Sequence, residues 1–146
     1  MSAEGSRSFV DTNVLVYAHD ASAGTKLDRA RGLVGDLWRS REGCVSVQVL
    51  QELFVTLTRR IATPLDSTTA ATVVADYAKW TTHAPASGDV LAAIEIHERD
   101  GISFWDAMIA RSAASLGCDL LYTEDLNAGQ RYGGVLVVNP FAETDE

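Results

Sequence analysis

The chain has 146 residues, 47% of them hydrophobic and 22% charged, which is the composition of one ordinary globular domain. Its 12 basic and 20 acidic side chains give a net charge of −8, which argues against a protein that coats nucleic acid through bulk electrostatics but permits an enzyme that binds it locally. No apolar run approaches the roughly 20 residues that cross a bilayer, and the polar N-terminus lacks the apolar core of a secretory signal, so we expect one domain over residues 1–146, in the cytoplasm and not in a membrane.

Short strand-like runs alternate with helical patterns along the chain. The strand-like runs are Ser8 to Asp11, Gly43 to Val45, Asp119 to Thr123 and Val135 to Val138. Strands rich in Val and Leu that alternate with helices predict an α/β fold, a three-layer α/β/α sandwich with a central parallel sheet. Cys44 and Cys118 adjoin two of these runs without any zinc-binding spacing, so we expect buried, reduced thiols.

The expected helices begin at polar capping residues and end near Gly or Pro. After a short apolar helix from Val14, they run from Thr25 to about Ser40, Ser46 to about Arg60, Ser67 to about Trp80, Ser87 or Asp89 to Gly101, and Ser103 to Gly117. Thr25 with Asp28, and Ser103 with Asp106, form the pattern of a capping box.

Four acidic residues lie where apolar segments meet a turn or a helix: Asp11, Glu52, Asp106 and Asp125. Asp11 and Asp125 follow predicted strands, and ligands of parallel sheets bind beyond the carboxyl ends of the strands. Asp106 and Glu52 lie in helices that can flank the same crevice. Carboxylates in apolar surroundings need charge compensation, for which a divalent cation is well suited, so the pattern indicates phosphate chemistry.

Each acid also has a purely structural interpretation. Asp11 can cap a helix, Asp106 can complete a capping box, and Glu52 can point outward from the border of an apolar stripe. Asp125 can be a turn residue, and Glu124 competes with it for a ligand role. We favour Asp125 because neighbouring side chains diverge after an extended strand.

At these residues the chain resembles the PIN-domain family, and within it the VapC-type toxins of bacterial toxin–antitoxin pairs. The resemblance spans nearly the whole sequence. Its segments are Phe9-Val10-Asp11-Thr12-Asn13-Val14, Gln51-Glu52-Leu53, Phe104-Trp105-Asp106-Ala107, and Leu121 to Gln130 running into Val137-Val138-Asn139-Pro140-Phe141.

The resemblance implies an endoribonuclease that depends on Mg²⁺ or Mn²⁺ and cleaves RNA phosphodiesters. Asp11, Asp106 and Asp125 would hold the cation, while Glu52 would complete the acidic quartet and orient water or a second ion. The family pattern assigns supporting polar roles to a further set of residues: Thr12, Asn13, Thr123 and Asn127. It also implies a cognate VapB-type antitoxin and a homodimer.

Three other functions compete with this one. A receiver-type phosphorylation module also places acids and magnesium at strand ends, but it needs paired acids after the first strand and a lysine after the last. The only lysines, Lys26 and Lys79, fall in predicted helices. A catalytically idle PIN binding module and a deoxyribonuclease remain open, since the metal chemistry does not distinguish the sugars and only the 2′-hydroxyl marks RNA.

Overall fold

A mostly parallel sheet forms the middle layer of the protein. The computed structural model describes residues 6–142, and the strand order in its sheet is β3-β2-β1-β4-β6-β5. The strands are β1 (Ser8–Val10), β2 (Gly43–Ser46), β3 (Thr81–His83), β4 (Leu120–Tyr122), β5 (Arg131–Tyr132) and β6 (Val135–Val138). All pairs are parallel except β5 with β6, which makes one edge antiparallel.

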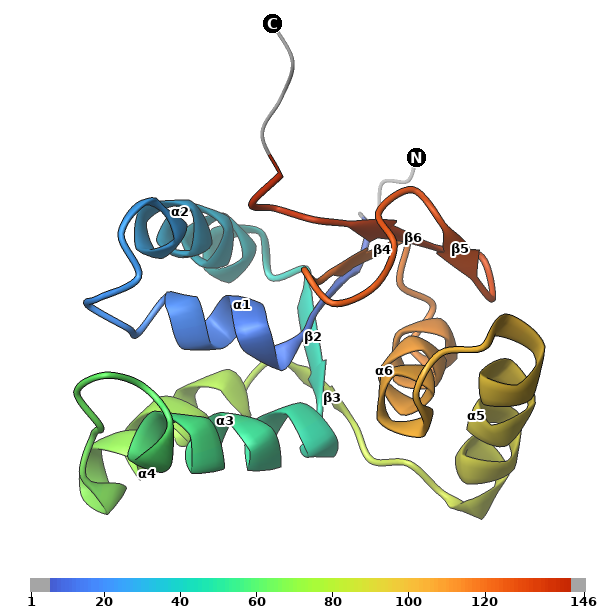
Figure 1. Ribbon diagram of the computed structural model, residues 1–146, viewed down its shortest axis with the longest axis horizontal. Helices are drawn as coiled ribbons and strands as arrows, with labels where there is room; N and C mark the ends of the chain where they lie inside the picture. Colours follow the sequence, from blue (N-terminus) through green and yellow to red (C-terminus); the bar gives the residue numbers. More distant parts are fainter. Residues whose placement is uncertain (1–5, 143–146) are drawn as a thin grey trace, which may run out of the picture.

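Helices cover both faces of the sheet (Figure 1). They are α1 (Thr12–Tyr17), α2 (Thr25–Ser40), α3 (Val47–Arg59), α4 (Ser67–Tyr77), α5 (Ser87–Asp100) and α6 (Phe104–Ser115). The chain steps outward from β1 to β2 to β3 through α1–α4, then returns through α5 and α6 to β4 on the other side of β1. Crossovers between parallel strands are right-handed. Because the chain first moves towards one edge of the sheet and then back, helices α1–α4 lie on one face and helices α5 and α6 lie on the other. The predicted three-layer sandwich is therefore confirmed.

Most predicted helix starts are correct because a side chain caps the free backbone N–H groups there. Ser46 Oγ accepts from Val49 N at 3.3 Å, and Ser103 Oγ accepts from Asp106 N at 3.1 Å. The predicted capping box at Thr25 is wrong. Thr25 is the first helical residue, and the cap before it is Gly24 at φ 65°, a left-handed conformation that glycine adopts without strain.

Two strands were not predicted. Strand β3 follows α4, which ends at Tyr77 and not at Trp80. Its three residues lie on an edge of the sheet and have no buried apolar side chain, so the sequence has no alternation to reveal it. Strand β5 has only two residues and forms the opposite edge.

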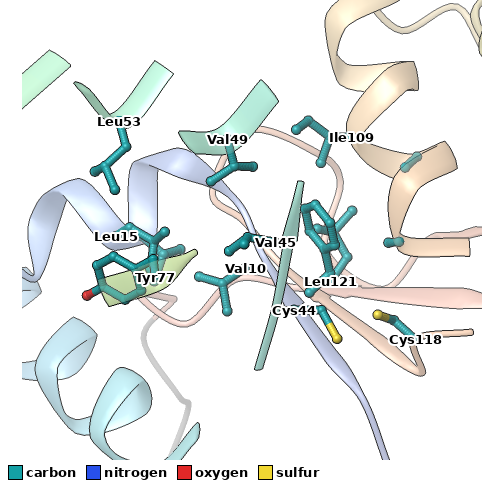
Figure 2. Close-up of a cluster of buried hydrophobic side chains, with 14 of the residues drawn as sticks. Val10, Leu15, Cys44, Val45, Val49, Leu53, Tyr77, Ile109, Cys118 and Leu121 are labelled. Atoms are coloured by element: carbon teal, nitrogen blue, oxygen red, sulfur yellow. The ribbon is translucent and has the colours of Figure 1, made fainter. Parts of the chain in front are cut away.

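The core lies between the sheet and the helices on either side. Figure 2 shows Val10, Val45 and Leu121 from the neighbouring strands β1, β2 and β4, surrounded by helical side chains such as Leu53 and Ile109. Cys44 and Cys118 are buried free thiols, as predicted. Among the helices of residues 6–142, none has the length and apolar character that crossing a membrane requires.

The strand order also fixes where a ligand can bind. From β1 the chain moves to β2 on one side, whereas β4 joins β1 from the other side, so the topological switch point lies between β1 and β4. Crevices of open α/β sheets form beyond the carboxyl ends of the strands at such a point. Asp11 directly follows β1, and Asp125 lies three residues after the end of β4.

Candidate active site

Asp11 is a buried carboxylate at the end of β1. It caps α1, with its Oδ1 accepting from the backbone N–H of Thr12 at 2.7 Å, and its Oδ2 accepts from Thr123 Oγ1 at 2.9 Å. Only 5% of its surface is exposed. Burial raises the pKa of Asp11 from 3.8 to about 7, the two hydrogen bonds oppose the rise, and the charges of Asp125 and Glu52 add to it.

Thr123 connects Asp11 to Asp125. Its fully buried hydroxyl accepts from Asp125 N at 3.0 Å and from Asn13 Nδ2 at 3.3 Å. Asn13 Nδ2 also donates to Asp125 Oδ2 at 3.0 Å. Residues that follow β1 and β4 are therefore tied together across the switch point.

Glu52 reaches the same place from α3. Thr12 Oγ1 donates to its Oε1 at 2.7 Å, and Gln48 Nε2 donates to its Oε2 at 3.2 Å. Gln48 Nε2 also lies 3.3 Å from the carbonyl oxygen of Trp105, so its amide links α3 to the start of α6. The sequence interpretation missed Gln48, although its position four residues before Glu52 on one helix places it beside that carboxylate.

Asp106 is a half-buried acid in the first turn of α6. Burial raises its pKa, with smaller contributions in the same direction from the charges of Asp125 and Glu52, while a hydrogen bond with Ser103 opposes the rise. Asp11 responds to the same two charges. The charges of Asp125 and Glu52 therefore act on both Asp11 and Asp106.

The supporting residues divide into two sets. Thr12, Asn13 and Thr123 each contact an acid of the quartet. Asn127 is outside this network, because its amide donates to Gln130 Oε1 at 3.3 Å on an exposed part of the chain. Thr12, Asn13 and Thr123 are positioned by the ends of β1 and β4. Asn127 lies further along the loop after β4, so the end of that strand does not fix the position of its side chain.

Glu124 has a different role from Asp125. It accepts from the Tyr17 hydroxyl at 2.6 Å and forms an ion pair with Lys26 Nζ at 2.9 Å. These hydrogen bonds and the charge of Lys26 lower the pKa of Glu124 against the opposing effect of burial. Glu124 is therefore held by a cation, whereas Asp125 is held by the uncharged amide of Asn13.

The acidic quartet has no cationic partner within the described residues. None of the ion pairs of residues 6–142 includes Asp11, Glu52, Asp106 or Asp125. A cavity of about 450 Å³ opens beside Glu52 and Asp125. Sequence interpretation did not connect three other lining residues with the site, Tyr17, Asp20 and Arg60, because only the folded chain brings them to it.

The donor set suits a hard divalent cation. It offers carboxylate oxygens whose charge is not compensated by nearby protein cations, the chemistry that Mg²⁺ and Mn²⁺ prefer. Within residues 6–142 no three His, Cys, Asp or Glu side chains are close enough together to hold an ion. Mg²⁺ is commonly held by one or two carboxylates and keeps several waters, so a cation at this site would be held partly through water.

Comparisons with known proteins agree with this fold. The sequence profile of the PIN domain matches residues 8–133, so the chain belongs to the PIN-domain family. No curated protein matches the sequence significantly.

Several solved structures share the fold. The structure of Mycobacterium tuberculosis VapC20, described as a Sarcin-Ricin loop cleaving toxin, has a TM-score of 0.64 at 22% identity, covering 81% of this chain and 89% of that one. A toxin–antitoxin complex from Klebsiella pneumoniae has a TM-score of 0.69 at 13% identity, covering 92% and 98%. VapBC2 from Rickettsia felis, bound to a DNA fragment from its promoter, has a TM-score of 0.58 at 18% identity, covering 81% and 87%.

Proposed function

We propose that this protein is an endoribonuclease that depends on Mg²⁺ or Mn²⁺ and acts in the cytoplasm as the toxin of a toxin–antitoxin pair. The observation that carries the proposal is that Asp11, Glu52, Asp106 and Asp125 form no ion pairs within residues 6–142, with the pKa of Asp11 raised to about 7. Membership of the PIN-domain family and the resemblance to toxin structures support the same activity.

Asp11, Asp106 and Asp125 would hold the cation directly or through water, and Glu52 would orient the attacking water. When bound, the cation supplies Lewis-acid stabilisation of the phosphate charge and a water of lowered pKa. Thr12, Asn13 and Thr123 hold the carboxylates in place through neutral hydrogen bonds. Such chemistry needs no nucleophilic side chain.

The test is cleavage of a mixed single-stranded RNA pool by antitoxin-free protein with Mg²⁺, Mn²⁺ or EDTA. A matched single-stranded DNA pool distinguishes ribonuclease from deoxyribonuclease activity, and Asp106→Asn is the control for the site. We expect RNA cleavage that requires metal and disappears in the variant. Absence of cleavage by a folded protein that binds the metal would reject the proposal in favour of a binding module.

The antitoxin would bind an apolar groove between α3 and α4. This groove has a volume of about 560 Å³ and is lined by Val47, Leu50, Gln51, Phe54, Val55, Ala71, Val74 and Ala75. Val47 and Val55 are 38% and 41% exposed. Covering such apolar side chains with a partner is energetically favourable, and exposed apolar patches often mark interaction sites. On α5, exposed Val90, Leu91 and Ile94 provide a separate surface for a homodimer.

Mutation can test the two surfaces separately. Val55→Asp should abolish binding of the cognate antitoxin and leave the toxin's sedimentation unchanged. Leu91→Asp should convert a dimer to a monomer in sedimentation velocity without loss of antitoxin binding. Retention of antitoxin binding by Val55→Asp would refute the assignment of the groove.

A further inference from the structure

The geometry points to Arg60 as the residue that receives an RNA phosphate beside the acidic site, an inference that rests on the proposed function. Among the described residues that line the cavity next to Glu52 and Asp125, Arg60 alone carries a positive charge, whereas Asp20, Glu52 and Asp125 are acidic. A protein with a net charge of −8 repels RNA at long range, so productive binding needs a local cation near the site.

Arg60 also lines a second cavity, of about 310 Å³. The two cavities share Glu52, Thr56 and Arg60, which are spaced four residues apart along α3 and its C-cap. Side chains at this spacing lie on one face of a helix. Together the cavities form a path along that face, from the acid to the arginine.

The position of Arg60 sets which phosphate it can bind. At 1.5 Å per residue, eight residues place it about 12 Å along the helix axis from Glu52. This separation of backbone positions places Arg60 beyond Glu52, towards the C-terminal end of α3. Arg60 would therefore hold a neighbouring phosphate of the same strand, not the phosphodiester that is cleaved.

The arginine is available for this role. It is exposed, and no acid of residues 6–142 forms an ion pair with it. Its planar guanidinium can donate two hydrogen bonds to one phosphate. The cavity walls beside it include the apolar side chains of Val16 and Ile61, which suit the face of an unpaired base. This cavity of about 450 Å³ has the volume of a small-ligand site, which is enough to accept one nucleotide.

A structural role for Arg60 also needs consideration, because cations near a helix C-terminus stabilise the helix dipole. Arg59 provides a matched control. It lies in the last turn of α3, is exposed, and lines neither of the two cavities. Arg59→Ala and Arg60→Ala remove the same charge from the same helix end, and only the second removes the phosphate contact.

The experiment compares wild type, Arg59→Ala, Arg60→Ala and Arg60→Lys in cleavage kinetics on a short fluorescent single-stranded RNA pool. We expect Arg60→Ala to raise KM roughly tenfold with kcat unchanged, because a remote phosphate contact contributes equally to substrate and transition-state binding. Arg60→Lys should give an intermediate KM, and Arg59→Ala should match wild type.

Binding without cleavage provides an independent measure. In EDTA, RNA binding can be measured by fluorescence anisotropy between about 50 and 200 mM KCl. The slope of the logarithm of the binding constant against the logarithm of the salt concentration should be smaller in magnitude for Arg60→Ala than for wild type by about 0.7, the value for one phosphate of a single strand. Arg60→Lys should keep the wild-type slope. If Arg59→Ala and Arg60→Ala lost RNA affinity equally, or if Arg60→Ala lowered kcat, the assignment would be overturned. Absence of cleavage by wild type would instead reject the ribonuclease, a result that the kinetics separate from failure at Arg60.

Discussion

Replacement of Asp11 by Asn should make metal-free protein more stable relative to wild type as the pH rises. The folded protein keeps a proton on Asp11 up to a pKa of about 7, whereas the unfolded chain releases it near 3.8. Between these values the native state binds more protons than the unfolded state, so the free energy of unfolding of wild type falls as the pH increases. Asn at this position does not titrate, so the variant lacks this fall.

The magnitude follows from the difference between the two pKa values. About 3 pH units, at about 1.4 kcal/mol each, correspond to about 4 kcal/mol lost in full above pH 7. Between about pH 5.5 and pH 8 the part lost is about 2 kcal/mol, because only the interval up to 7 contributes. Asn makes hydrogen bonds that differ from those of Asp, but they change the free energy of unfolding equally at the two pH values. Their contribution therefore cancels when the two pH values are compared.

The assay is urea denaturation of both proteins in EDTA at the two pH values, with Asp28→Asn, an exposed acid of α2, as the control. The difference in free energy of unfolding between Asp11→Asn and wild type should increase by about 2 kcal/mol from the lower to the higher pH. A difference that stays constant would refute the burial of a titrating carboxyl at Asp11. Asp28→Asn should show no such increase.

Adding metal should stabilise wild type more than Asp11→Asn. A cation that binds only the folded protein stabilises it by about 2.7 kcal/mol at a concentration 100 times its Kd. Wild type should gain this stability with Mg²⁺ or Mn²⁺, whereas Asp11→Asn should gain little and lose most cleavage. An equal gain in both proteins would show that the cation binds elsewhere.

Three further outcomes are expected. Cleavage should decline as the pH falls below about 7, because protons compete with the cation for Asp11; an activity profile flat down to about pH 5 would contradict this. Thr123→Val removes the hydroxyl that binds Asp11 and should weaken metal affinity roughly 10- to 100-fold in a titration followed by calorimetry. Gly43→Ala should destabilise the fold by about 1–3 kcal/mol in thermal melts, since its Cβ would lie 2.6 Å from the Trp80 ring, whereas Gly32→Ala, with nothing within 4 Å, should be neutral or stabilising.

The layers of the fold could be predicted because periodicity and capping act locally. Strands β1, β2, β4 and β6 are apolar runs, and Ser46 and Ser103 cap the helices they were expected to cap. Elements whose stability depends on a neighbour were missed. Strand β3 exists through its pairing with β2, and its residues show no pattern of their own.

The candidate site could be predicted in part for the same reason. Asp11 and Asp125 follow strands, so the parallel topology alone brings them together. Contacts between distant segments were beyond prediction, because no spacing rule connects them. The ion pair of Lys26 with Glu124 joins positions 98 residues apart. Arg60 lines the cavity only because of how α3 is oriented in the fold.

Uncharged groups surround the acids near the switch point in the described part of the chain. Hydrogen bonds to Asp11, Glu52 and Asp125 come from uncharged groups: hydroxyls, side-chain amides and backbone N–H groups. The nearby ammonium of Lys26 pairs with Glu124, one residue from Asp125. A neutral donor fixes the direction of a carboxylate but leaves its charge uncompensated, whereas an ion pair would cancel that charge. Within residues 6–142, the fold thus separates an acid that forms an ion pair from acids that form none, as the proposed divalent cation requires.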